Sequence, residues 1–408
     1  MIRSSKVTLK FANTEKRQQI NLFIDEYKNV ISQFIDLLWN LEKVPNLIPK
    51  EISSQISTWL SARAIQCAGK QASGIVRGTR RKQEQRLFII NKFLQEGKIE
   101  QANKLQKIYN NVKISKPNIF NICPELDERF IKQDWNNSTI FDGYITLASL
   151  GNKLKIEIPV KKHKHFNKLN EKGNLLKGIR LSKNFITFNF EISEPQSKSY
   201  GKIIGVDIGI KKTFMSSDKQ HSTKNSDLHD LDNILNRLSK KKKGSNSFNK
   251  LVNLRKNYIN WSINQLNLSD VQKVNIEDIK NLRFKNRTSR KLSHFVYKEI
   301  FDKLESHCVE NGVRINKVPS AFTSQRCSSC GWVQKSNRYR ELFKCKICKF
   351  TCDADLNGAM NISFDLPKLS KQVLLSKINK TGFYWNLISQ EFIVPDSPKT
   401  NVDICLQN

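Results

Sequence analysis

This sequence has few acidic residues compared with basic ones, and it has no long apolar run. No apolar run approaches the roughly 18 residues that a membrane-spanning helix needs. The N-terminal residues MIRSSKVTLKF lack the apolar core and the small-residue cleavage site of a signal peptide. Gly (16) and Pro (10) are too scarce among 408 residues for a collagenous or low-complexity chain. We therefore expect a soluble intracellular protein with no membrane partner.

The shortage of acid leaves a large positive charge. Lys and Arg number 70 against 37 Asp and Glu, so the formal net charge is +33. Self-repulsion on this scale favours a polyanionic partner, and nucleic acid is the usual one because its phosphates are neutralised by Lys and Arg. The alternative is a Lys-rich solubility surface produced by AT-rich codons. That bias explains abundant Lys but not missing acid, so we favour nucleic acid.

The hydrophobic period changes along the chain and indicates more than one domain. A 3.6-residue period in residues 15–41 and 53–96 predicts long helices, and from about residue 140 the period is 2. Two predicted strand pairs follow: Tyr144–Leu150 with Lys153–Val160, and Gly178–Leu181 with Phe185–Ile192. They predict a small antiparallel barrel or sheet.

A basic segment, Lys161–His165, lies between these strand pairs, and we interpret it as a loop. His163 and His165 could suggest a metal site, but they have no further partner in the pattern, so a solvated phosphate-contacting loop is favoured. The polar stretch Ser193–Ser199 is the expected main domain boundary.

Three acidic positions stand out after that boundary. Asp207 lies between Gly205 and Gly209 on a predicted strand, Glu277 ends another strand, and the third acid is Asp353 or Asp355 at the start of a helix. Alone, each is more often a turn, capping or surface acid, and Asp278 competes with Glu277. Together, in a protein poor in acid, they have the composition of a divalent-metal site. Two Mg²⁺ ions about 3.5–4 Å apart need several carboxylate oxygens.

Two cysteine pairs form the most specific motif. Cys327 and Cys330 are followed, after fourteen residues, by Cys345 and Cys348, and this spacing is typical of a zinc ribbon. Four thiolates complete a closed tetrahedron, so the predicted site is structural and not catalytic. Cys352 could replace Cys348. The basic residues between the pairs fit a nucleic-acid-facing ribbon: Lys335, Arg338, Arg340 and Lys344.

Three further basic stretches are candidates for contacts with a nucleic-acid backbone. One lies in the second helical region, one between two helical patterns that meet at Gly244-Ser245, and one leads into a helical pattern from Leu292 to Leu304. Each could instead be a solvated face. The candidate contacts are Arg77, Arg80, Arg81, Lys240, Lys241, Lys242, Lys243, Arg287, Arg290 and Lys291.

The order of these motifs resembles one family. Gly-Val-Asp-x-Gly, a strand-end Glu-Asp-Ile, Pro-Ser-x-x-Thr-Ser-Gln-x-Cys-x-x-Cys-Gly, Cys-x-x-Cys and Asp-Ala-Asp-x-Asn-Gly-Ala-x-Asn-Ile resemble TnpB, the RNA-guided endonuclease of insertion sequences, and the miniature type V CRISPR effectors. The motifs cover about residues 201–362. The first 200 residues match the family only in layout.

The resemblance assigns the site residues. The three RuvC carboxylates fall on Asp207, Glu277 and Asp355, which would bind two catalytic Mg²⁺ ions. The acid two residues before the Asn is the family's ligand, hence Asp355 and not Asp353. One structural Zn²⁺ falls on Cys327, Cys330, Cys345 and Cys348. Two departures are Gly358, where relatives usually have Ala, and Phe295, where they often have Trp.

The implied fold is multidomain α+β. It has an RNase H-like RuvC domain with an inserted zinc ribbon, preceded by a wedge β-barrel that carries a helical recognition insertion. The expected segments are the first wedge strand (1–12), the helical recognition lobe (13–125), the rest of the wedge barrel (126–198), the RuvC-like nuclease with two acidic motifs (199–318), the zinc ribbon (319–351), the third acidic motif (352–366) and a C-terminal segment of unknown role (367–408).

The implied activity is RNA-guided cleavage of DNA. A guide RNA pairs with double-stranded target DNA beside a short flanking motif, and one RuvC site hydrolyses the phosphodiester with Mg²⁺. The protein would be prokaryotic and cytoplasmic, nucleoid-associated when bound to DNA, with one protomer or a homodimer on each guide RNA. The alternatives are a catalytically silent RNA-guided regulator, a transposase or other transposition-associated DNA-binding protein, and a zinc-ribbon transcription factor.

Overall fold

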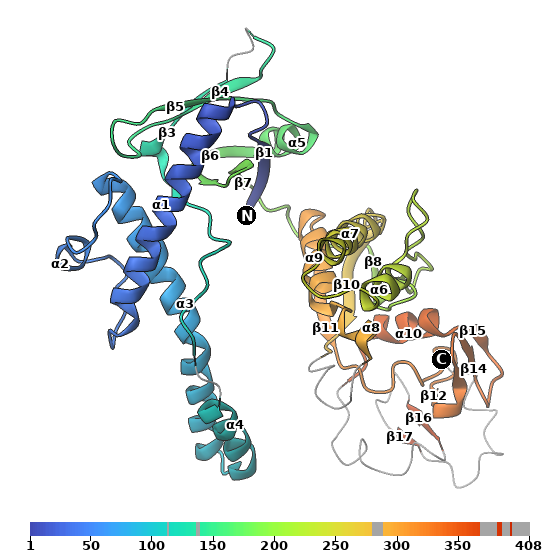
Figure 1. Ribbon diagram of the computed structural model, residues 1–408. Coiled ribbons are helices and arrows are strands. Elements are labelled where there is room, and N and C mark those ends of the chain that lie inside the picture. The colour runs from blue at the N-terminus through green and yellow to red at the C-terminus, as the bar shows by residue number, and fades with distance from the viewer. Residues whose placement is uncertain (112–113, 136–138, 280–288, 368–381, 386–391, 394–408) are drawn as a thin grey trace. The chain divides into compact units, whose positions relative to one another are not determined.

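The computed structural model describes residues 1–111, 114–135, 139–279, 289–367, 382–385 and 392–393. They form two compact units, Met1–Ser193 and Glu194–Asn408 (Figure 1). Each unit has a hydrophobic core of its own, and both contain helices and strands, so the predicted mixed α+β class is confirmed. In the described part of the chain, no helix is long and apolar enough to cross a membrane.

The strands of the first unit form two antiparallel sheets. The four-stranded sheet has the order β1 (Ile2–Thr8), β7 (Phe185–Ile192), β6 (Gly173–Leu181) and β2 (Glu125–Leu126). The other consists of β3 (Ile131–Asp134), β4 (Gly143–Leu147) and β5 (Ile156–Val160), with the 3₁₀ turn η1 (Glu128–Phe130) before β3. Both predicted strand pairs are confirmed. β5 begins at Ile156 and not at Lys153, because Asn152 and Lys153 have positive φ angles and belong to the turn.

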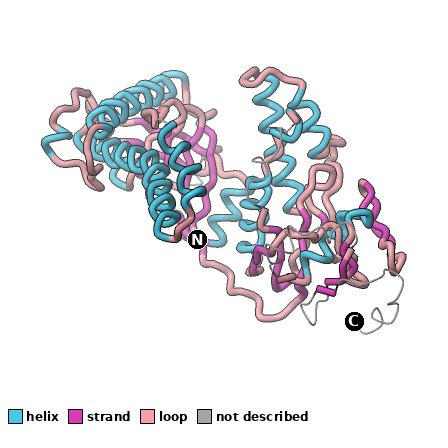
Figure 2. Tube along the Cα trace, turned by 90° about the horizontal axis from the view of Figure 1, so that it is seen from below, coloured by secondary structure: helices cyan, strands magenta, loops and turns pink. Residues whose placement is uncertain are grey.

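Four helices connect β1 to β2: α1 (Thr14–Trp39), α2 (Lys50–Ser53), α3 (Ala62–Gln95) and α4 (Ile99–Asn111). The Asn13 side chain accepts a hydrogen bond from the backbone N–H of Lys16 and caps α1. The long helices α1 and α3 lie side by side because small residues of α3, such as Ala64, Ala68 and Ala72, are fully buried (Figure 2). The second helical region is divided, since Ser61 caps a separate helix, α3.

The segment Lys161–His165 is not entirely a loop. His163 occupies the N-cap position of α5 (Lys164–Lys172), whose residues Phe166 and Leu169 enter the core. The Nε2 atom of His163 lies 3.0 Å from the backbone oxygen of Lys6. The Nδ1 atom of His165 lies 3.4 Å from Oγ of Ser5. The two imidazoles therefore contact strand β1.

The second unit is built on a four-stranded sheet with the order β11 (Arg314–Val318), β10 (Val271–Glu277), β8 (Lys202–Asp207) and β9 (Met215–Ser216). The first three are parallel and β9 is antiparallel. The apolar side chains of β8 and β10 pack with α6 (Leu231–Ser239), α7 (Asn246–Ile263) and α9 (Tyr297–Glu310). The helical pattern after Lys291 is divided into α8 (Arg290–Ser293) and α9, because Val296 has a non-helical backbone conformation.

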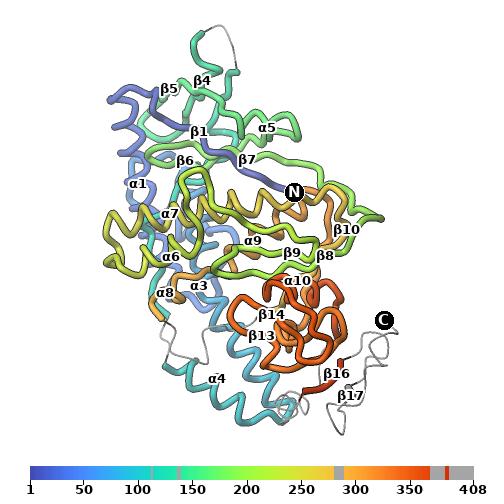
Figure 3. The backbone as a smooth tube through the Cα atoms, turned by 90° about the vertical axis from the view of Figure 1, so that its right-hand side faces the viewer, coloured from blue at the N-terminus to red at the C-terminus, as the bar shows by residue number. Residues whose placement is uncertain are grey.

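Helix α10 (Ala354–Ser363) packs against β8 (Figure 3). Gly205 makes the close approach possible: a Cβ atom at this position would lie 2.0 Å from the backbone oxygen of Ala359. Since alternate residues of a strand face opposite sides, Gly205 and Asp207 face α10, whereas Ile204 and Val206 enter the main core. The sheet therefore presents Asp207 to α10.

Between β11 and α10 the chain forms small sheets. One consists of β13 (Arg338–Tyr339), β14 (Leu342–Lys344) and β15 (Thr351–Asp353), preceded by the 3₁₀ turn η2 (Lys335–Asn337). The other joins β12 (Trp332–Val333) to β16 (Phe383–Trp385) and β17 (Phe392–Ile393) from the C-terminal segment. The sequence offers no pattern for β16, because three residues are too few to show a period.

Candidate active site and metal centre

The structure brings the three selected acids together. Asp207 ends β8 and Glu277 ends β10, and these strands are parallel neighbours, so both residues lie at the same edge of the sheet. Asp355 is in the first turn of α10. One turn further along α10, a Cβ atom at Gly358 would lie only 3.2 Å from Oδ2 of Asp207. Gly358 therefore lies directly against the Asp207 carboxylate.

The electrostatics of the site follow from this convergence. Burial raises the pKa of Asp207 to about 7, and the negative charges of Glu277 and Asp355 contribute to the rise. Burial also raises the pKa of Glu277. Arg338 opposes both shifts, and its Nη2 donates a 3.0 Å hydrogen bond to Oδ1 of Asp355. The site therefore holds more negative charge than its neighbouring arginine compensates.

Side chains outside the predicted set hold Glu277 in place. The hydroxyl of Thr323 donates to Oε1 of Glu277, and the hydroxyl of Tyr297 donates to its backbone oxygen at 2.7 Å. Neither residue was identified from the sequence, although Thr323 is the threonine of the motif before the first cysteine pair. Arg338 was identified only as a basic residue of the ribbon. Its contact with Asp355 depends on how the ribbon docks, which no local pattern indicates.

Asp353 and Asp355 have different surroundings. Oδ1 of Asp353 accepts hydrogen bonds from the backbone N–H groups of Asp355 and Leu356, so Asp353 is the N-cap of α10. Its Oδ2 pairs with Nζ of Lys212 at 2.7 Å. Both oxygens of Asp353 are therefore engaged in structural contacts, whereas Asp355 acts electrostatically on Asp207.

The three carboxylates fit a divalent cation by their chemistry. Carboxylate oxygens are the ligands that Mg²⁺ prefers. Burial is the main cause of the raised pKa of Asp207, and the repulsion by Glu277 and Asp355 that adds to it is what a bound cation would relieve. Among the described residues, only the four cysteines have ligand atoms that all lie within 4.8 Å of one another. In the described part of the chain, the three acids do not form a closed group of this kind.

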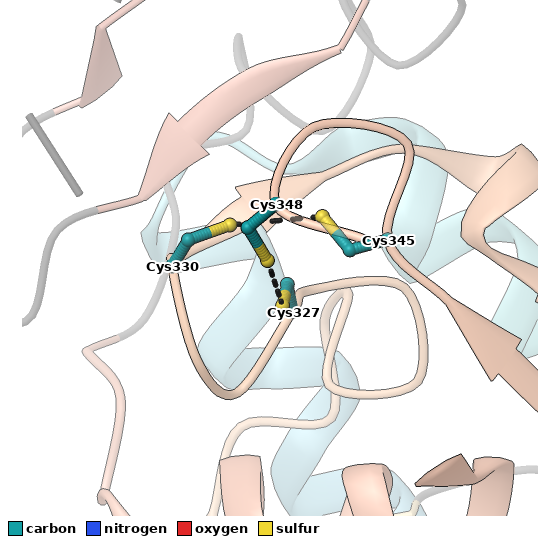
Figure 4. Close-up of side chains that lie close together, drawn as sticks. All are labelled: Cys327, Cys330, Cys345 and Cys348. Atoms are coloured by element: carbon teal, nitrogen blue, oxygen red, sulfur yellow. Dashed lines mark hydrogen bonds between the residues drawn. The ribbon is translucent and has the colours of Figure 1, made fainter. Parts of the chain in front are cut away.

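The second candidate centre is the cysteine cluster (Figure 4). The Sγ atoms of Cys327 and Cys348 lie 3.6 Å apart, as do those of Cys330 and Cys345. Four thiolates at about 2.3 Å from one zinc ion would be separated by about 3.8 Å, so this cluster could hold zinc with little movement. Hydrogen bonds from Cys327 and Cys330 lower the pKa of Cys345, which favours its thiolate. Cys352 lies in β15, outside the cluster.

The basic candidates occupy two regions. In the first unit, Arg77, Arg80 and Arg81 help to line an open pocket of about 520 Å³. Arg80 donates to the backbone oxygens of Trp39 and Leu41 and thereby ties α3 to the C-terminal end of α1. Contacts of these arginines with nucleic acid stay a prediction.

In the second unit, residues 240–243 lie in the turn between α6 and α7. Nη2 of Arg290 donates to the backbone oxygen of Lys241 at 2.5 Å, and Lys291 pairs with Asp232 at 2.6 Å. Arg287 lies outside the described residues. Their nucleic-acid contacts also stay predictions.

Comparison with known proteins gives similarities over parts of the chain. Residues 297–362 match the sequence model of the Cas12f1-like TNB domain. The CRISPR-associated endodeoxyribonuclease Cas12f1 of Sulfoacidibacillus thermotolerans is 34% identical over 99 residues, which are 24% of this chain and 22% of that protein. The putative RNA-guided DNA endonuclease InsQ of Escherichia coli K12 is 28% identical over 205 residues, 42% of this chain and 50% of InsQ.

The matched regions thus span half or less of these relatives. A cryo-EM structure of a Cas12f1–sgRNA–target DNA complex aligns with 89% of this chain and 98% of its own, with a TM-score of 0.45 and 16% identity. A TnpB-like protein of Aquifex aeolicus is 28% identical over 97 residues, 22% of this chain and 31% of that protein. The domain match and these relatives confirm that this chain is similar to the TnpB proteins and the miniature type V effectors, the resemblance that its motifs indicated.

Proposed function

We propose that this protein is an RNA-guided DNA endonuclease that hydrolyses phosphodiester bonds at one site. The observation that carries the proposal is the convergence of Asp207, Glu277 and Asp355 beside Arg338 in a chain with a net charge of +33. The names of the relatives, an endodeoxyribonuclease and a putative RNA-guided DNA endonuclease, support it. Clustered acids in so basic a protein are most simply explained by a cation that works on a bound phosphodiester.

The proposal extends to the architecture. In this interpretation the second unit is an RNase H-like RuvC domain with a zinc ribbon inserted at about residues 319–351. The first unit is a wedge barrel, formed by its two sheets, that carries helices α1–α4 as a recognition lobe. The parallel strands that end in Asp207 and Glu277, and the helix that begins near Asp355, support this interpretation.

Each site residue has a distinct task in the proposed reaction. Mg²⁺, when held by the three carboxylates, would lower the pKa of a bound water and neutralise developing charge on the phosphodiester. Thr323 and Tyr297 fix the orientation of Glu277. The Nη2 of Arg338 contacts Asp355 and its Nε contacts the backbone oxygen of Arg340, so the remaining donors of the guanidinium would serve a phosphate oxygen. Asp207, whose pKa is about 7, must release its proton from the carboxylate before it can act as a ligand.

The proposed partners are a guide RNA and double-stranded target DNA. Base pairing would read the target sequence, while Lys and Arg contact backbones. The four lysines Lys240–Lys243, in the turn between α6 and α7, offer such contacts in the second unit. The flanking motif on the DNA, and one or two protomers on each guide RNA, stay predictions. Zinc at the four cysteines would be structural, because all four positions of its tetrahedron are filled by protein.

The proposal is tested with the full-length protein and the RNA that copurifies with it. Sequencing this RNA identifies the guide and hence a target plasmid. We expect cleavage with Mg²⁺, its loss after EDTA is added, and its loss in Asp207→Ala with guided DNA binding retained. Asp302→Asn is the matched control, because Asp302 forms an exposed i,i+4 pair with Lys298 on α9.

Other outcomes separate the alternatives. Guided binding without any cleavage by the wild type would support a silent regulator and refute the proposal. Strand-transfer products on transposon ends would indicate a transposase. Absence of a defined copurifying RNA would favour a transcription factor. Loss of both binding and cleavage in Asp207→Ala would mean that Asp207 is a structural residue.

A further inference from the structure

Arg326, the residue before the first cysteine of the cluster, is a buried charge with uncharged partners. It is 3% exposed. Its Nε and Nη2 atoms donate to the backbone oxygen of Trp385 at 3.0 and 2.9 Å, and its Nη1 donates to Oδ1 of Asn361 at 2.9 Å and to the oxygen of Cys327 at 3.3 Å. A buried charge is costly unless an opposite charge lies nearby.

A zinc-loaded cysteine cluster would supply the opposite charge. Arg326 directly precedes Cys327 in the chain, and its Nη1 donates to the backbone oxygen of that cysteine, so the guanidinium lies beside the first ligand of the cluster. One zinc ion bound by four thiolates carries a net negative charge. The guanidinium is therefore placed to balance a loaded zinc site from a position next to the first ligand.

The same guanidinium holds the C-terminal strand β16. Two of its nitrogens converge on the oxygen of Trp385, whose own N–H donates to the oxygen of Gly331 at 3.0 Å. The rings of Trp332 and Tyr384 pack edge to face at 4.8 Å. At Gly382, φ is +93°, and a Cβ atom there would lie 2.1 Å from the ring of Trp332. Strand β16 is therefore closely fitted to the ribbon.

Arg326 also contacts α10, the helix of Asp355. Besides the bond from Nη1 to Asn361, the backbone oxygen of Arg326 accepts hydrogen bonds from the side-chain amides of Asn357 and Asn361, both at 2.8 Å. Oδ1 of Asn357 in turn accepts from the N–H of Ser328. One residue thus joins the cysteine cluster, the C-terminal strand and the helix that carries a site acid.

We propose that Arg326 is a positioning residue that couples zinc binding at the cysteine cluster to the docking of β16 and to the placement of α10. In consequence, residues 382–385 of the C-terminal segment contribute to zinc binding by the ribbon. The coupling to zinc and to β16 stands on its own. Its effect on cleavage, through Asp355, rests on the proposed function.

The test compares Arg326→Gln and Arg326→Lys in the full-length protein with its copurified RNA. Zinc affinity is measured by competition with a colorimetric chelator, and the docking of β16 by hydrogen exchange of residues 382–385. Loss of a partner near a metal ligand typically costs 10–100-fold in metal affinity, and we expect a loss of this size for Arg326→Gln, together with faster exchange at Trp385.

Arg326→Lys separates charge from geometry. Lysine keeps the positive charge but cannot span Trp385, Asn361 and Cys327 with one nitrogen. We therefore expect the zinc affinity of Arg326→Lys to stay within about threefold of the wild type, because loss of a partner near a ligand costs at least about tenfold. Hydrogen exchange at Trp385 should nevertheless be faster than in the wild type. A merely space-filling residue would not show this rescue. Arg314→Gln, at an exposed position on β11, is the control.

A second variant approaches the coupling from the other side. Gly382→Ala should push β16 away from Trp332 and leave Arg326 and the cysteines unchanged. We expect faster exchange at 383–385 and weaker zinc binding. Gly74→Ala, where a Cβ atom meets nothing within 4 Å, is the matched control.

The proposal is overturned if Arg326→Gln retains wild-type zinc affinity, if its exchange at Trp385 is unchanged, or if Arg326→Lys loses as much zinc affinity as Arg326→Gln. It is also overturned if Gly382→Ala releases β16 and zinc affinity stays the same. Zinc affinity and hydrogen exchange can be measured whether or not the protein cleaves DNA. If both give the expected results and the protein does not cleave DNA, the proposed function is refuted while the coupling stands.

Discussion

Asp207→Asn should make the cation-free second unit more stable at alkaline pH while it removes the proposed nuclease activity. The Asp207 carboxylate is surrounded by protein and faces Glu277 and Asp355, and its pKa is raised from 3.8 to about 7. The folded state therefore binds a proton that the unfolded state has already released between these pH values. The wild type must lose stability as pH rises through this window, because its folded state binds more protons there. Asparagine carries no charge and avoids this loss.

The size of the effect follows from the shift. The interval from 3.8 to about 7, at about 1.36 kcal/mol per pH unit, gives an upper limit of about 4 kcal/mol. Asp207 keeps some contact with solvent, which screens the repulsion, so we expect about 1–3 kcal/mol above pH 8. In a domain of this size 1 kcal/mol moves Tm by about 2–4 °C. The expected gain is several degrees at pH 8 and close to zero at pH 4.

The assay is calorimetric unfolding of the wild type and Asp207→Asn from pH 4 to pH 8, without divalent cations in the buffer. Chelators are left out so that zinc stays on the cysteines. The transition of the second unit is followed, and Asp302→Asn serves as the control for loss of a carboxylate. Added Mg²⁺ should stabilise the wild type but not Asp207→Asn. Asp207→Asn and the wild type should differ in Tm at pH 8, and the difference should shrink as pH falls. Equal Tm values at pH 8, or a difference that stays constant down to pH 4, would refute the prediction that the Asp207 charge destabilises the second unit.

The remaining predictions concern the contacts around the acids. Thr323→Val removes the donor to Glu277 and should slow single-turnover cleavage about ten- to a hundredfold, since a hydrogen bond to a charged group contributes about 1.5–3 kcal/mol; guided binding should not change. Cys327→Ser should abolish zinc retention and expose the ribbon to limited proteolysis, because zinc stabilises its fold; a protease-resistant, zinc-free ribbon would contradict this. Gly205→Ala should lower the unfolding free energy by several kcal/mol in denaturant melts, because its Cβ meets backbone. Gly358→Ala should lower the unfolding free energy much less, because its Cβ meets only the end of a carboxylate side chain. Equal losses of unfolding free energy in Gly205→Ala and Gly358→Ala would show that α10 does not pack as described.

A local pattern in the sequence predicts those parts of the fold and the site whose position it determines. Alternation along a strand fixes which side chains share a face. The period of 2 is therefore enough to place Asp207 and Glu277 opposite the apolar side chains of the main core, where α10 meets the sheet. The cysteine spacing is also local, because each pair forms its own turn. The helical and strand periods located most elements for the same reason.

What the sequence analysis missed depends on docking between distant segments. Thr323 contacts Glu277 across 46 residues. Arg338 on strand β13 contacts Asp355 on helix α10, and Arg326 contacts Trp385 across 59 residues. No period or spacing encodes such contacts. The helical breaks after Ser53 and before Tyr297 were also missed, because a short segment that leaves the helix scarcely changes the apolar period.

The ribbon is therefore better understood as part of the candidate active site than as an attached module. It follows β11, beside the strand that ends in Glu277, and returns to the chain immediately before α10. Arg338 comes from it, Thr323 lies just before its first cysteine, and Arg326 secures α10. The strands β8 and β10 fix Asp207 and Glu277, whereas the segment with the cysteines supplies the donors to Glu277 and Asp355. Sheet and cysteine segment thus fix different parts of the candidate site, and we expect that loss of zinc from the cysteines would release these donors and leave β8 and β10 paired.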